Sequence, residues 1–226
     1  MGKTKQRKVS VLDRGTNQSI AEALQGQAER GEETKEASQV KKEIDLGLDI
    51  STSVVGIVGL EHEGKFVFMD HLQFKAKQNT LWLKADAMEE KFKELSKTYT
   101  IKRIFVEASA KGFTPGFSSA DTLFTLAKFN GIVSYIATRT FKAPVYDINV
   151  SSARKAAGIK VNRKDKTRTT KEQVFDAVRT AYPNFPWLKH VSATGKKKGQ
   201  EVYDKTNYDR CDAWVICRGG QLTTST

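Results

Sequence analysis

The sequence is poor in residues that form disulfides or metal clusters. It has only two cysteines and three histidines among 226 residues. Cys211 and Cys217 lie six residues apart in one predicted helix and point to different faces, so neither a disulfide nor a metal pair is predicted. This usage fits a reducing compartment, and we expect a cytoplasmic protein. The three histidines form no cluster and are expected to be ordinary surface or turn residues: His62, His71 and His190.

Long apolar runs are also missing. No segment approaches the roughly 20 apolar residues that a membrane-spanning helix needs, and the first eight residues lack the apolar stretch of a signal peptide. No basic amphipathic helix with aromatic anchors is visible either. We therefore expect no membrane partner.

Positive charge is what the sequence has in excess. The formal net charge is +12, and residues 1–43 contribute only two of these charges, so the remaining residues are the basic part. A basic surface attracts polyanions, of which nucleic acid is the commonest. Residues 1–43 are polar and lack aromatics, which predicts a solvated N-terminal extension, with an arm that contacts nucleic acid as the alternative.

Residues 44–220 have the texture of a folded domain. Apolar runs predict strands over residues 44–50, 54–60, 65–74, 102–108 and 143–148. Helical spacing predicts helices over residues 80–97, 118–138, 150–157, 170–181 and 207–218, with Trp82 and Trp214 on buried faces. This order predicts an α/β fold with a five-stranded mixed sheet flanked by helices.

Four carboxylates stand out against this layout. Asp49 and Glu107 each end a predicted strand, and Asp209 and Asp212 lie three apart near the start of the last helix. Alone, Asp49 could begin a turn, and Asp209 could favour the helix dipole. Together they would repel one another unless a cation lay between them, and hard oxygen ligands suit Mg²⁺ or Mn²⁺. The spacing predicts a metal-dependent nuclease site.

The DNA-contacting residues are expected in two segments. Residues 154–171 hold eight Lys or Arg and one acid, which predicts phosphate contacts, although a flexible basic loop is the alternative. From this segment we select Arg154, Lys155, Lys164, Lys166, Arg168 and Lys171. The glycine-containing loop 109–118 adds Phe113 and Phe117, and either ring could stack on an unpaired base or fold back onto the core.

The ordered set of motifs resembles the RuvC family of Holliday junction resolvases, within the ribonuclease H-like superfamily. Leu46-Gly-Leu-Asp49 followed by Val55-Gly-Ile-Val58 looks like the first hairpin of that family. Phe105-Val-Glu107 precedes a small-residue helix, and Asp209-Arg-Cys-Asp212 looks like the paired aspartates of its last helix. Two segments depart from the family pattern, the N-terminal extension and residues 184–206.

The resemblance implies both an activity and an assembly. It implies two-metal hydrolysis with Asp49 as the bridging ligand, leaving 5′-phosphate and 3′-hydroxyl ends. It also implies a homodimer that cuts a four-way DNA junction by paired symmetrical nicks, with helix 118–138 as a candidate interface. Three alternatives stay open: a related nuclease for other branched DNA or RNA–DNA hybrid, an actin-like ATPase suggested by residues 48–53, and a non-catalytic DNA-binding module.

Overall fold

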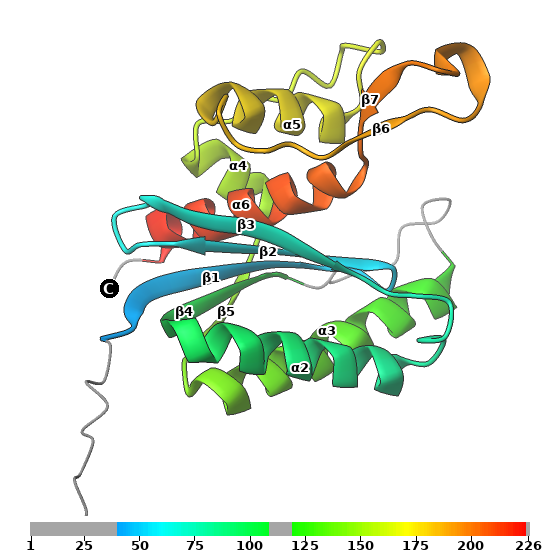
Figure 1. Ribbon diagram of the computed structural model, residues 1–226. Coiled ribbons are helices and arrows are strands. Elements are labelled where there is room, and N and C mark those ends of the chain that lie inside the picture. Colours follow the sequence, from blue (N-terminus) through cyan, green and yellow to red (C-terminus); the bar gives the residue numbers. More distant parts are fainter. Residues whose placement is uncertain (1–39, 109–118, 225–226) are drawn as a thin grey trace, which may run out of the picture. The chain divides into compact units, whose positions relative to one another are not determined.

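The computed structural model describes residues 40–108 and 119–224, so residues 1–39 and the loop 109–118 lie outside the described part. Its centre is a five-stranded sheet in the order β3–β2–β1–β4–β5 (Figure 1). The strands are β1 (Lys42–Ile50), β2 (Val54–Leu60), β3 (Phe66–Gln73), β4 (Tyr99–Glu107) and β5 (Val145–Ile148). The first three form an antiparallel meander, while β4 and β5 run parallel to β1. The sheet is therefore mixed, as predicted.

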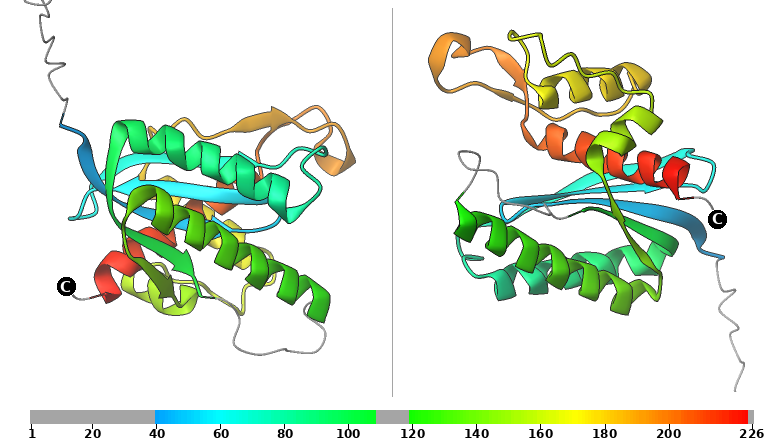
Figure 2. Two further views of the ribbon diagram at one scale, coloured as in Figure 1. Left: turned by 90° about the horizontal axis from the view of Figure 1, so that it is seen from below. Right: turned by 180° about the vertical axis from the view of Figure 1, so that it is seen from behind.

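Helices cover both faces of the sheet (Figure 2). On one face lie α2 (Leu81–Thr98) and α3 (Ala120–Phe141), side by side. On the other face α6 (Thr206–Thr223) lies directly on the sheet, and α4 (Val150–Ala156) and α5 (Thr170–Ala181) pack against α6. A small hairpin precedes α6, made of β6 (Lys189–Val191), a 3₁₀ turn (Gly195–Lys197) and β7 (Glu201–Tyr203). The sequence pattern did not predict this hairpin.

The alternation of side chains along β1 assigns its two faces. Leu46 and Leu48 are fully buried in the core that the sheet shares with α2 and α3. Because successive side chains in a strand point to opposite faces, Gly47 and Asp49 are on the side of α6. One face of this strand thus contributes to the core under α2 and α3, and its other face contacts α6.

Two glycines allow α6 to lie directly on the sheet. A Cβ atom at Gly47 would come within 2.5 Å of the carbonyl oxygen of Ala213. A Cβ atom at Gly56, on the neighbouring strand, would collide with the carbonyl oxygen of Asp209. The glycines of the first hairpin are therefore explained by close approach of a helix backbone.

Single-residue expectations for the core were partly right. Trp214 is buried, as predicted, and both cysteines are buried and free. The prediction for Trp82 was wrong, because 63% of its surface is exposed. It lies in the first turn of α2, roughly a quarter turn from the stripe formed by Ala85, Met88, Phe92 and Leu95, since each residue advances about 100° around a helix. In the described part of the chain, no helix is long and apolar enough to cross a membrane.

Candidate functional site

Adjacent parallel strands place Asp49 and Glu107 at the same edge of the sheet. β1 and β4 pair with Leu48 opposite Val106, so the two carboxylates follow one step later at the ends of both strands. Leu48 and Val106 both face the core under α2 and α3, and the next residues therefore face α6. The side-chain amide of Asn130 donates to the carbonyl oxygen of Glu107 at 3.1 Å and so fixes the end of β4.

The beginning of α6 brings the two aspartates to this edge. Gly56 is the register partner of Asp49 on β2, and the backbone of Asp209 lies against Gly56. Asp212 is one turn further along α6 and is buried. The four carboxylates predicted as a group thus come from β1, β4 and α6 and meet at one edge of the sheet.

Burial, and then neighbouring carboxylates, raise the pKa values of Asp49, Glu107 and Asp212. Burial raises the pKa of Asp49 well above its ordinary value, and the charges of Asp212, Glu107 and Asp209 raise it further, with Lys171 opposing them. Burial, and then the charge of Asp212, also raises the pKa of Glu107. The pKa of Asp212 is raised by burial, against the opposing effects of Lys171 and Arg154. A cluster in which ionisation is this unfavourable is typical of functional sites rather than of stabilising ion pairs.

Two cations partly compensate this charge. The Nζ atom of Lys171, on α5, lies 3.2 Å from Oδ1 of Asp209 and 3.7 Å from Oδ2 of Asp212. Burial lowers the pKa of Lys171, but the carboxylates outweigh burial and raise it overall. Arg154, on α4, places Nη2 at 3.5 Å from Oδ1 of Asp212, and its Nε atom is buried without a hydrogen-bond partner in the described part of the chain. The sequence predicted both cations as DNA contacts but gave no sign that they face the aspartates.

The donor chemistry of this cluster fits a hard divalent cation. All four side chains offer carboxylate oxygens, which are the ligands that Mg²⁺ and Mn²⁺ prefer. Among the residues that the structure describes, however, no three His, Cys, Asp or Glu side chains already converge on one point as a metal site. The ammonium group of Lys171 is bound between Asp209 and Asp212. In this arrangement Lys171 takes the place between the aspartates that a cation would occupy, and the metal remains a prediction.

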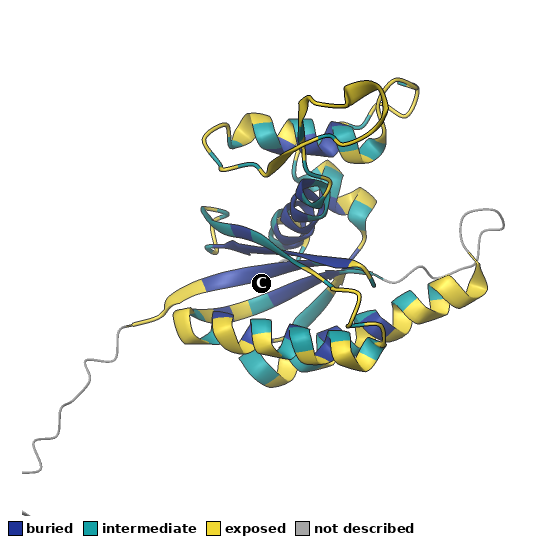
Figure 3. Cartoon of the chain, turned by 45° about the vertical axis from the view of Figure 1, so that its right-hand side comes forward, coloured by how far each residue is buried: buried dark blue, intermediate teal, exposed yellow. Residues whose placement is uncertain are grey.

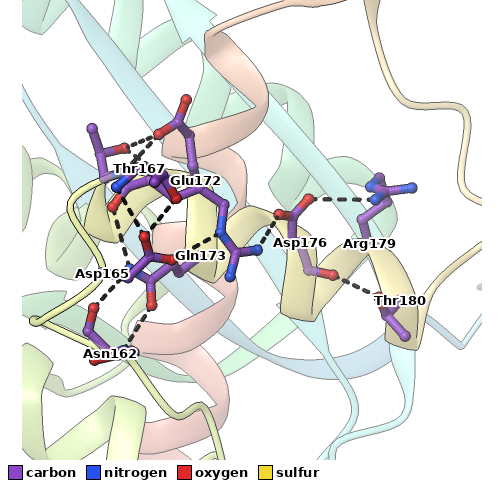
Figure 4. Close-up of polar contacts among 10 residues, drawn as sticks. Asn162, Asp165, Thr167, Glu172, Gln173, Asp176, Arg179 and Thr180 are labelled. Carbon is purple, nitrogen blue, oxygen red and sulfur yellow. Dashed lines mark hydrogen bonds and ion pairs between the residues drawn. The ribbon is translucent and has the colours of Figure 1, made fainter.

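The basic segment between α4 and α5 is held in place by hydrogen bonds (Figure 4). Gln173 is buried, and its amide accepts from the backbone nitrogen of Asn162 at 2.7 Å and donates to the Asn162 carbonyl at 3.1 Å. Asp165 accepts from the backbone and hydroxyl of Thr167. A capping box of Thr169 and Glu172 then starts α5. These contacts give residues 157–169, named here the fixed loop, a defined conformation, and their contact with DNA stays a prediction.

The predicted DNA-contacting residues divide into four groups. Lys155, Lys164 and Lys166 are exposed, as phosphate contacts must be. Arg168 is also exposed but already pairs with Asp165 and Asp176, at 3.3 Å and 3.2 Å. Arg154 and Lys171 face the carboxylates, as described above. The two phenylalanines of loop 109–118, Phe113 and Phe117, lie outside the described residues.

A basic cleft lies next to the carboxylates. Its volume is about 310 Å³, and it is lined by α4, the fixed loop and the first residue of α5. Four of its lining residues are cationic and none of them is acidic: Arg154, Lys155, Lys160 and Arg163. A cleft of this charge beside four carboxylates suits a phosphate-bearing partner whose reactive bond lies at the carboxylates.

Comparison with known proteins identifies the fold. No protein-family model matches the sequence, and no curated protein is significantly similar to it. Thermus thermophilus RuvC in complex with a Holliday junction substrate matches with a TM-score of 0.51 and 12% identity, over 80% of this chain and 93% of that chain. A second structure of that protein gives 0.49 at 15% identity, over 79% and 93% of the two chains. The yeast mitochondrial Holliday junction resolvase gives 0.46 at 11% identity, over 80% and 78%.

The class of fold is therefore the ribonuclease H-like α/β fold, with a mixed five-stranded sheet between two helical layers. More particularly, the arrangement of this chain is similar to that of RuvC. This confirms the fold predicted from the sequence motifs.

Proposed function

We propose that this chain is a metal-dependent, structure-selective endonuclease that resolves Holliday junctions by paired symmetrical nicks. The observation that supports this most strongly is the meeting of Asp49, Glu107, Asp209 and Asp212 at one sheet edge, within a RuvC-like fold. Burial raises the pKa values of Asp49 and Glu107, and the charges of neighbouring carboxylates raise them further, so the cluster lacks enough positive charge of its own. A bound divalent cation would supply that charge.

The four carboxylates would hold Mg²⁺, with Mn²⁺ as a substitute. When bound, such ions lower the pKa of water and neutralise the charge that develops on a leaving oxygen. Asp49 has carboxylate neighbours on both β4 and α6, which suits the bridging position that the family resemblance implies. If a bound cation supplied positive charge at the aspartates, Lys171 and Arg154 would be available to contact a phosphate group. The resemblance also implies 5′-phosphate and 3′-hydroxyl products.

Branched DNA is the proposed partner, bound by a homodimer. The fixed basic loop and its cleft supply exposed cations beside the carboxylates. On the opposite face, α3 exposes Phe124 and Tyr135 by 74% and 62%, with Lys128 on the same helix edge. Large exposed aromatics in such a row are typical of an interface. We propose this edge as the dimer contact, which would give the assembly two active sites.

The metal site is tested by Asp49→Asn, which keeps the shape of the side chain and removes its charge. We expect the wild type to cut a four-way junction only with Mg²⁺ or Mn²⁺ present. The variant should lose at least about a thousandfold in rate, as removal of one group from a cooperating set does, and still bind the junction. Asp86→Asn, an exposed position on α2, is the matched control and should cut normally.

Cutting by Asp49→Asn at the wild-type rate, or full activity in excess chelator, would contradict the metal site. Flap, duplex and RNA–DNA hybrid substrates in the same gel test the alternative targets. ATP turnover measured in parallel tests the actin-like alternative, for which we expect no activity.

A further inference from the structure

The β6–β7 hairpin departs from the family pattern, and its tip is built by specific backbone contacts. Beyond the three strand pairs, the backbone nitrogen of Ser192 donates to the carbonyl of Gln200 at 2.9 Å, and Gly199 donates back to Ser192 at 2.8 Å. Gly195 and Gly199 have φ angles of 70° and 80°, which side chains rarely allow. The tip is therefore a defined turn rather than a loose loop.

The base of the hairpin is anchored to the two helices that carry the candidate site. Asn207, on α6, is fully buried, and its amide donates to the Leu188 carbonyl at 2.8 Å and accepts from the Leu188 nitrogen at 3.3 Å. On α5 the ring of Phe175 packs against Trp187 and Tyr203, with ring centres 5.2 Å and 5.1 Å apart. The hairpin is thus fixed relative to α5 and α6, which bear Lys171 and both aspartates.

The charge of the hairpin is concentrated at its tip. Residues 184–206 hold five lysines and two acids. Both acids are already engaged, Glu201 with Lys189 at 2.7 Å and Asp204 with His190 at 3.2 Å. The three lysines at the tip are exposed and have no acidic partner at ion-pair distance within the described residues: Lys196, Lys197 and Lys198. Figure 3 shows the hairpin almost entirely exposed, in contrast to buried α6.

The tip lies beside the fixed loop. Lys197 and Arg168 line one cleft of about 250 Å³, together with the acids Glu172 and Asp176 of α5. Both cations help to lower the pKa of Glu172, after the larger effect of its hydrogen bonds with Thr169. Figure 1 shows the hairpin beside α5, at the end of the molecule away from α2 and α3. The tip and the fixed loop therefore place cations on the two sides of one cleft.

We propose that this hairpin is a second nucleic-acid-binding element, which holds the sugar–phosphate backbone of a duplex arm away from the bond that is cut. The three neighbouring lysines lie on an anchored hairpin and form no ion pair with the described residues. They suit a row of phosphates, because each phosphate contact releases counterions without reading the base sequence. Residues 192–200 at the tip include no aromatic side chain and no apolar one larger than Ala193, which offers little to a protein partner. This inference rests on the proposed function, since it names how the same nuclease holds its substrate.

The test is a variant with Lys196, Lys197 and Lys198 all changed to Gln. Binding of labelled four-way junction and plain duplex is measured in chelator, so that nothing is cut, between about 50 and 200 mM salt. We expect affinity for both to fall about tenfold, and the slope of log affinity against log salt to fall by about 1 for each lost phosphate contact. Single-turnover cutting at saturating protein should stay unchanged, because the tip does not touch the reacting bond.

Two further variants control for charge and folding. Changing Lys93, Lys97 and Lys142 to Gln removes the same charge from the α2 and α3 side and should leave the slope as in the wild type. Changing the three tip lysines to Arg should restore both affinity and slope. Equal affinity and slope in the tip-Gln and control variants would overturn the proposal, as would weaker binding with an unchanged slope. If the wild type cuts no junction, the proposed activity fails, while duplex binding still decides the role of the hairpin.

Discussion

At the scale of single residues, the candidate site is a group of partly buried acids held together by two cations that are distant in sequence. The carboxylates were predictable because strand ends and a helix start can be read from local apolar patterns. The cations were assigned a different role because their partners are remote in sequence: Arg154 and Asp212 are 58 residues apart. Only the packing of α4 on α6 reveals this pair. Local sequence patterns thus identify carboxylates whose positions need a functional explanation. They do not identify the cations that neutralise part of the negative charge of these carboxylates.

Next to this site, His71 makes stability depend on pH. Nε of the buried Arg210 donates to Nδ1 of His71 at 3.2 Å, which requires a neutral imidazole with Nδ1 unprotonated. Burial and the charge of Arg210 lower the pKa of His71, although Asp70 opposes them. As pH falls through the ordinary histidine pKa of about 6.5, the unfolded chain takes up this proton before the folded chain does. The free energy of unfolding must then decrease.

We therefore expect His71→Gln to flatten the loss of stability between about pH 7 and pH 5, since the amide oxygen can still accept from Arg210 at every pH. Urea denaturation at a series of pH values in chelator measures this difference. If the two proteins lose stability in parallel as pH falls, then His71 is not the group responsible.

At the scale of elements, apolar runs and helical spacing were enough to place the five strands of the sheet and the helices that cover it. The β6–β7 hairpin was missed because each strand has only three residues and none of its residues is buried in the main cores. Its structure depends on Asn207 and Phe175 instead, which belong to α6 and α5. The exposure of Trp82 was missed because this residue lies at the edge of the apolar stripe of α2. Burial at such an edge depends on how far the neighbouring elements extend, and helical spacing does not give this.

The placement of α6 on the sheet gives a prediction at this scale. Gly56→Ala should lower the free energy of unfolding by about 1–3 kcal/mol, as insertion of a methyl group into a packed contact does. It should also reduce junction cutting, because the added Cβ atom displaces the backbone of Asp209. Thermal or urea denaturation and the cutting assay measure the two effects.

Gly131→Ala is the matched control for that substitution. A Cβ atom at Gly131, within α3, would meet nothing within 4 Å. Alanine is favoured over glycine inside a helix by about 1 kcal/mol, so this variant should be as stable as the wild type or more stable. A Gly56→Ala protein that is fully stable and active would show that the backbone of α6 does not depend on this contact.

At the scale of the whole molecule, the two faces of the sheet have different proposed roles. The α4–α6 side carries the carboxylates, the basic cleft and the hairpin, while the α2–α3 side exposes large aromatic side chains. If α3 is the dimer contact, the DNA-binding surfaces of both copies remain free. A two-fold dimer then presents two cutting sites to the opposing strands of one four-way junction.

Changing both Phe124 and Tyr135 to Asp should convert the dimer into a monomer, because two charges would be buried without partners at the contact. Sedimentation should then give about half of the wild-type mass, whereas Leu222→Asp, at an exposed apolar position on α6, should keep the wild-type mass. On a four-way junction the wild type should make paired nicks within one binding event, and the monomer should release singly nicked junctions.

We also expect the wild type to cut junctions in preference to linear duplex at matched salt. Equal rates on the two substrates would reduce the proposal to a metal-dependent nuclease of ribonuclease H-like fold, and paired nicks from the monomeric variant would exclude α3 as the contact that coordinates cutting.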